Sequence, residues 1–252
     1  MIEAKKFPQV QLEHFSKSYG YGKKKALACN DISLSFCAGM VTGLLGPNGA
    51  GKTTILKALC GVHYPDEGSI KICFENEQTD DEKLIRSNTG FVPETPLLDR
   101  NLTVKETLFS SAELFGLSHN QAEQSVSNAV ELCSLTEVYF QKVGTLSKGY
   151  MQRTSFAKAL SHNPCVLILD EFSGGLDPAQ IVQMREVIKR LADTKAIILS
   201  THHIDEATAL CENVYILSHG EIVSSGTIDE VTNAAKAHTL EQAFLSLTSG
   251  AK

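Results

Sequence analysis

The chain has 252 residues, of which 42% are hydrophobic and 21% charged, and its formal net charge is −6. This composition is typical of a globular protein, and the acidic balance argues against a nucleic-acid partner, which a basic surface would bind. The longest apolar runs, "CVLIL" and "AIIL", are far shorter than the roughly 18 residues that cross a bilayer. With no apolar signal-peptide core near the N-terminus, we expect a cytoplasmic protein. The seven cysteines form no C-x-x-C pair, which favours reduced thiols over metal ligands or disulfides.

Strands and helices alternate along the chain, which predicts an α/β fold with a largely parallel sheet. Three strands are expected in the N-terminal part, at "QVQLEHF" (9–15), "DISLSF" (31–36) and "MVTGLLG" (40–46). A helix should follow at "TTILKALCG" (53–61), where apolar residues recur at helical spacing.

From about residue 95 to 160 the pattern becomes helical, which predicts a helical insert between two halves of the sheet. Buried strands should follow at "CVLILD" (165–170) and "AIILS" (196–200), separated by a helix with Asp177 as its cap and Pro178 at its first position. The segment 213–226 has the pattern of a hairpin, and two short helices should close the chain. Four helix starts carry the capping-box pattern: Thr103–Glu106, Ser118–Gln121, Thr227–Glu230 and Thr239–Gln242.

The stretch "GPNGAGKT", residues 46–53, matches G-x-x-x-x-G-K-[ST] and lies between an expected strand and an expected helix. Its glycines let the backbone fold tightly, so that successive N–H groups and the N-terminus of the helix can face an anion. Lys52 would place its charge on the outer phosphates, and the Thr53 hydroxyl would bind Mg²⁺. We therefore predict a site for ATP and Mg²⁺. The residues expected to contact the nucleotide here are Gly46, Pro47, Asn48, Gly49, Ala50, Gly51, Lys52, Thr53 and Thr54.

Two acids end the apolar strand "CVLIL", and this end of a parallel sheet is where ligands bind. Asp170 can hold Mg²⁺ through water, and Glu171 can polarise the attacking water as a catalytic residue. His202 follows another buried strand and can contact a γ-phosphate and orient that water. A histidine after a strand can equally be structural, and His203 beside it shows that residue type alone does not decide.

Together with these motifs, "LSKGY" at residues 146–150 gives the chain a resemblance to the ATP-binding subunits of ABC transporters, whose usual signature is LSGGQ. The resemblance runs from about residue 9 to the end of the chain. It implies a P-loop NTPase core with a mainly parallel sheet, an N-terminal antiparallel β part and an inserted helical subdomain. Residues 1–252 would then form one ABC ATPase domain. Its parts would be the ATP-binding core (about 1–94 and 161–225), the helical signature subdomain (about 95–160) and the C-terminal helices (about 226–252).

The resemblance also implies roles for residues outside the glycine-rich loop. Tyr19 would stack on adenine, with Tyr21 as the alternative. Glu94 stands where the family usually has glutamine and would approach Mg²⁺ or the water. Ser147 and Gly149 of "LSKGY" would contact the nucleotide, with Gly149 allowing a close backbone approach. In the loop "SGGLDP", Asp177 would lie near the interface between two subunits.

In this family two subunits meet head to tail, and each ATP lies between the glycine-rich loop of one and the signature helix of the other. The implied partners are a membrane permease subunit and a second copy of the chain or a related ATPase, at the inner face of the cell membrane. The C-terminal segments "GEIVSSGTIDEV" and "TLEQAFLSLT" are similar to subunits of compact exporters. Two alternatives remain: a soluble ABC ATPase acting on nucleic acid or ribosomes, and a P-loop kinase of a small molecule.

Overall fold

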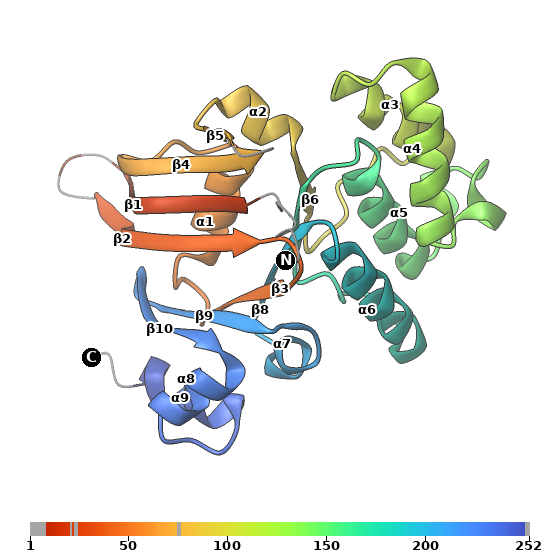
Figure 1. The fold of residues 1–252 in the computed structure, drawn as a ribbon. Coiled ribbons are helices and arrows are strands. Elements are labelled where there is room, and N and C mark those ends of the chain that lie inside the picture. The colour runs from red at the N-terminus through yellow and green to blue at the C-terminus, as the bar shows by residue number, and fades with distance from the viewer. Residues whose placement is uncertain (1–8, 21, 23–24, 75–76, 250–252) are drawn as a thin grey trace, which may run out of the picture.

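The computed structural model describes residues 9–20, 22, 25–74 and 77–249, and their strands form two sheets (Figure 1). The first sheet is antiparallel, in the order β2-β1-β4-β5. Its strands are β1 Gln9–Tyr19, β2 Ala26–Cys37, β4 Glu67–Phe74 and β5 Glu77–Thr79. The expected N-terminal antiparallel part is therefore confirmed.

The second sheet has the order β10-β9-β3-β8-β7-β6 and is parallel except for β10, which pairs antiparallel with β9. Its strands are β3 Val41–Leu45, β6 Thr89–Val92, β7 Val166–Asp170, β8 Ala196–Thr201, β9 Asn213–Ser218 and β10 Glu221–Thr227. Every residue of β3 and β8 is buried, as expected for central strands covered on both faces. The predicted α/β fold with a mainly parallel sheet is confirmed.

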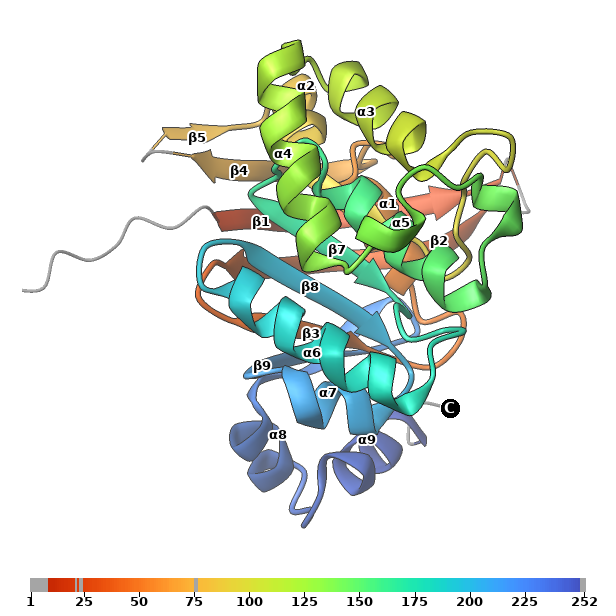
Figure 2. The ribbon, with the colours of Figure 1, turned by 90° about the vertical axis from the view of Figure 1, so that its right-hand side faces the viewer.

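Helices cover both sheets and form a group of their own beside them. They are α1 Lys52–Leu59, α2 Glu82–Ser87, α3 Val104–Leu114, α4 His119–Leu132, α5 Lys148–Leu160, α6 Pro178–Ala192, α7 Ile204–Leu210, α8 Ile228–Ala234 and α9 Leu240–Ser249. Figure 1 shows α3, α4 and α5 standing together at one side of the sheets, where the sequence predicted a helical insert. Figure 2 shows α6 and α7 against the parallel sheet, with α8 and α9 beside its β9–β10 edge. Within the part of the chain that the structure describes, no helix has the length and apolar character needed to span a membrane.

Capping residues fix several of these helix starts. Thr103 and Thr227 each form the reciprocal capping box that the sequence predicted. The box at Thr239 is only half formed. The Thr239 hydroxyl accepts from the backbone N of Gln242, but Gln242 Oε1 accepts from the backbone N of His238 instead of Thr239. The side chain thus reaches one residue further back than expected.

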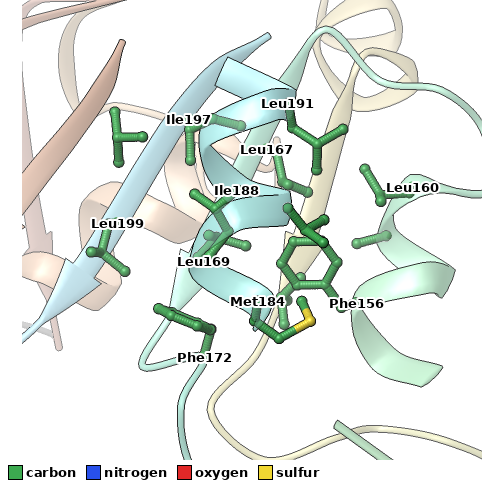
Figure 3. Packing of buried hydrophobic residues seen from close by; sticks show 14 of the residues in the cluster. Phe156, Leu160, Leu167, Leu169, Phe172, Met184, Ile188, Leu191, Ile197 and Leu199 are labelled. Carbon is green, nitrogen blue, oxygen red and sulfur yellow. The ribbon is translucent and has the colours of Figure 1, made fainter. Parts of the chain in front are cut away.

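The parallel sheet separates two hydrophobic clusters. Along β7, Leu167 and Leu169 face one cluster, whereas Val166 and Ile168 face the other. This is the period-two alternation of a strand that is buried on both faces. Phe156 of α5 packs in the first cluster with residues of β7 and α6, as Figure 3 shows. The helical group is therefore joined to the sheet by a shared core next to the end of β7.

Candidate nucleotide-binding site

The glycine-rich loop connects the end of β3 at Leu45 to the start of α1 at Lys52. Gly49 and Gly51 have φ values of 82° and 110°, a region that favours glycine. A Cβ on Gly51 would also lie 2.7 Å from the Ala28 carbonyl oxygen of β2. Strand β2 thus lies so close to the loop that glycine is required at residue 51, in the tight turn that directs backbone N–H groups toward an anion.

Lys52 is only 8% exposed, and its Nζ donates to the carbonyl oxygens of Gly46, at 2.5 Å, and Pro47, at 3.2 Å. Burial lowers the pKa of this ammonium group, while the nearby charges of Glu171 and Asp170 oppose the shift. A buried cation at the first position of a helix fits the phosphates of a nucleotide, because the helix end and the charge attract the same anion.

A cleft of about 340 Å³ opens over this loop. It brings together residues from five separate parts of the sequence: Tyr19, Ala28, Asn48, Gly49, Ala50, Gly51, Lys52, Thr53, Thr54, Glu94, Asp170 and Glu171. All but Ala28 were predicted from the sequence. Nothing in the sequence marks Ala28, which lines the cleft because β2 runs beside the loop.

The two acids at the end of β7 have different surroundings. Burial raises the pKa of the Asp170 carboxyl, and the charges of Glu171 and Glu94 raise it further. Glu171 has a φ of 48°, an uncommon value for a non-glycine residue, and its backbone N donates to Ser200 O of β8 at 2.9 Å. Its Oε1 lies 2.5 Å from Nδ1 of His202, which directly follows β8. The structure therefore places His202 beside Glu171, a contact that the sequence did not predict, although His202 does not line the cleft itself.

The donor groups in the cleft suit a hard divalent cation. Thr53, Asp170 and Glu94 offer a hydroxyl and two carboxylates, and oxygen atoms are the ligands that Mg²⁺ prefers. The half-buried Asp170 carboxyl, whose pKa is raised, would be stabilised as a carboxylate by such a cation.

Tyr19 stands at the rim of the cleft, at the end of β1. Its hydroxyl donates to Thr54 Oγ1 at 3.4 Å, the residue is 40% exposed, and its ring meets the His63 ring edge to face. An exposed ring next to the loop can stack on a base. Tyr21, the alternative, lies outside the described residues.

Ser147, Gly149 and Asp177 lie outside the cleft of their own chain. Ser147 is exposed and caps α5, since its Oγ accepts from Tyr150 N at 3.3 Å. Asp177 caps α6 by accepting from Gln180 N at 2.9 Å. The α-carbon of Gly149 faces the Gln180 side chain, which a Cβ at that position would overlap. Packing within one chain therefore favours glycine at residue 149, because the Gln180 side chain fills the space where a Cβ would lie.

The turn between β9 and β10 contacts the glycine-rich loop. The sequence analysis did not connect this turn with the site. Gly220, between β9 and β10, donates its backbone N–H to Ala50 O at 3.0 Å and accepts from Asn30 N at 2.8 Å. Its φ is 80°, and a Cβ would lie 2.8 Å from Ala28 O. The sequence signal was the "HG" pair in the predicted hairpin, but its contact with the loop depends on the sheet order.

The loop between β3 and α1, with acids at the end of β7, defines a P-loop nucleotide-binding protein. The sequence model of the family described as "ABC transporter" matches residues 29–174. "Nod factor export ATP-binding protein I" of Burkholderia orbicola (strain AU 1054) is 39% identical over 207 residues, which cover 82% of this chain and 67% of that protein. "ABC transporter ATP-binding protein NatA" of Bacillus subtilis (strain 168) is 31% identical over 239 residues, which cover 94% of this chain and 97% of that protein. The chain thus spans about two thirds of the Nod factor relative and nearly all of NatA.

Solved structures agree with these sequence relatives. A structure described as the ATP binding subunit of an ABC transporter superposes with a TM-score of 0.83 at 27% identity, covering 94% of this chain and 98% of that one. A dimeric ATP-binding cassette bound to ADP and Pi gives a TM-score of 0.76 at 25% identity, covering 86% of this chain and 98% of that one. The chain belongs to the ABC transporter family and is an ATP-binding subunit of it.

Proposed function

We propose that this subunit hydrolyses ATP with Mg²⁺ and that the reaction powers export of a substrate through a separate membrane permease. The observation that carries the proposal is the cleft over the glycine-rich loop. There the buried ammonium of Lys52 and the carboxylates of Asp170 and Glu171 converge from two segments, the start of α1 and the end of β7. Lys52 and Asp170 suit a metal-bound triphosphate, and the Glu171 carboxylate suits its hydrolysis.

Within this proposal the loop residues 46–54 hold the phosphates, with Lys52 on the outer ones, and Tyr19 stacks on the adenine. Thr53, Asp170 and Glu94 hold Mg²⁺, which neutralises phosphate charge when bound. Glu171 polarises the attacking water. His202 contacts the γ-phosphate and orients the water, and its contact with the Glu171 carboxylate holds that group in place.

The proposed active unit is a head-to-tail dimer with a second copy of the chain or with a related ATPase subunit. Ser147 supports this, because it is exposed at the N-terminus of α5 and yet lies outside the cleft of its own chain. A helix N-terminus carries roughly half a positive charge and free N–H donors, which suit a γ-phosphate held by another chain. In this arrangement Asp177 lies near the interface between subunits.

The permease is proposed to bind in a groove of about 370 Å³ between the core and the helical group. Apolar side chains line it and are exposed to solvent, namely Val62, Phe91 and Leu97. Such exposed apolar residues in one groove are typical of a protein interface. Export is favoured because relatives are named as export ATP-binding proteins. The subunit would then sit on the inner face of the cell membrane through its permease.

Phosphate release from ATP by the purified chain tests the enzymatic part. We expect Mg²⁺-dependent release without any added acceptor, and its loss in Lys52→Ala and Glu171→Gln. ADP formation that needs an acceptor would instead indicate a kinase. Membrane fractionation of the native host tests the permease part. Leu97→Asp should release the subunit from membranes, while Leu245→Asp, at another exposed apolar residue, on α9, should not. A wild-type subunit found only free of membranes would contradict the transport proposal.

A further inference from the structure

Gln152 lies one turn after the start of α5, where it is only 3% exposed. Its Nε2 donates to the backbone carbonyl of Phe172 at 2.9 Å. Its Oε1 is buried and has no hydrogen-bond partner among the described residues. Because a carbonyl only accepts, the amide NH₂ must be the group that faces Phe172. A buried amide with an unpaired oxygen is unfavourable for stability, so packing alone does not account for a glutamine here.

The carbonyl that Gln152 holds belongs to the residue directly after Glu171. Two contacts of Glu171 involve β8 and the residue after it: its backbone N donates to Ser200 O, and its Oε1 lies next to His202 Nδ1. Gln152 adds an anchor from α5, and the buried Phe172 ring lies in the core beside Met184 (Figure 3). A residue with a φ of 48° is held in place by its surroundings rather than by its own preference. The hydrogen bond from Gln152 to the Phe172 carbonyl therefore helps to fix the backbone directly after Glu171.

Further contacts join the start of α5 to the loop that follows Glu171. Gly149 packs directly on Gln180, and a Cβ on Gly175 would lie 3.5 Å from Cβ of Lys148. The start of α5 and residues 171–180 are thus in close contact, and movement of the helix start would be transmitted to Glu171 through Gln152.

We infer that Gln152 is a positioning residue for ATP hydrolysis, which holds Glu171 in its working orientation from helix α5. The inference rests on the proposed function, in which Glu171 acts on the nucleotide of its own chain. In the proposed dimer the N-terminus of α5 meets the nucleotide of the partner. The bond from Gln152 to Phe172 then connects the two nucleotide sites.

The test compares Gln152→Met, which keeps the length of the side chain and removes the donor, with Gln183→Met, an exposed control on α6. For Gln152→Met we expect kcat to fall about tenfold, the order of one lost hydrogen bond, with the KM for ATP within about twofold of wild type. ATP-driven dimerisation, measured by light scattering in a Glu171→Gln background, should be unchanged by Gln152→Met. Gln183→Met should leave all three quantities unchanged.

Gln152→Glu supplies a readout that a structural role would not produce. A protonated carboxyl can donate to the Phe172 carbonyl, whereas a carboxylate cannot. The activity of this variant relative to wild type should therefore rise as pH falls.

An unchanged kcat in Gln152→Met, or a flat activity ratio in Gln152→Glu, would overturn the inference. So would loss of dimerisation in parallel with kcat, since Gln152 would then support the nucleotide-binding end of α5 instead of Glu171. Absence of hydrolysis by the wild type, or of ATP-driven dimerisation by Glu171→Gln, would overturn the proposed function, and the inference with it.

Discussion

Replacing Gly51 by alanine tests how firmly the glycine-rich loop is held against β2. An alanine at a φ of 110° is strained, by about 1–3 kcal/mol. Its Cβ would also lie 2.7 Å from Ala28 O and 3.1 Å from Cys29 Sγ. Because the first neighbour is backbone, the overlap should cost a further ~1–3 kcal/mol. Gly49→Ala is the matched control, since its φ is 82° but a Cβ there would have no atom within 4 Å.

Thermal unfolding without nucleotide measures the difference. In a chain of 252 residues, 1 kcal/mol corresponds to about 2–4 °C in Tm. The extra overlap should therefore lower the Tm of Gly51→Ala by about 2–12 °C relative to Gly49→Ala. ATP binding, followed by fluorescence, should be weakened in Gly51→Ala, because any relief of the overlap moves the loop. Equal Tm values for the two variants would refute the conclusion that β2 leaves no room for a side chain at residue 51.

Three further changes test the site. Burial raises the pKa of Asp170, so its ionisation weakens the folded state as pH rises. In thermal scans, Asp170→Asn should therefore have a higher Tm than wild type from about pH 4 upward. The same variant should lose Mg²⁺-dependent hydrolysis. Ser147→Arg should abolish hydrolysis but leave ATP binding to the loop intact in equilibrium titrations; surviving turnover would contradict the role given to α5. Glu94→Gln should keep hydrolysis but raise severalfold the Mg²⁺ concentration that gives half-maximal rate, because one anionic group in the cleft becomes neutral.

The fold was predictable where local patterns are strong. The loop at 46–53, the buried strands and the Asp177 cap of α6 all follow from short stretches of sequence. The sequence analysis missed β4, although Ile70 and Ile72 alternate in it as in a half-buried strand. It also missed α2 and α7, which have six and seven residues and are too short to show a helical period.

The site was predictable by residue type but not by contact. Glu171 and His202 could be named as candidates from the sequence, yet their contact depends on the parallel pairing of β7 with β8. The link from Gln152 to Phe172 joins residues 20 apart and depends on how α5 packs against the end of β7. Such contacts follow from tertiary packing, which periodicity does not specify.

The central claim, that ATP joins two subunits between the loop of one and α5 of the other, is tested most directly by the mass of Glu171→Gln in solution. Light scattering should give twice the 27.4 kDa of the chain with saturating Mg²⁺-ATP, and 27.4 kDa with ADP. Adding Ser147→Arg to this variant should return the mass with ATP to that of one chain. A mass of 27.4 kDa with saturating ATP, or a dimer that Ser147→Arg leaves intact, would contradict the account.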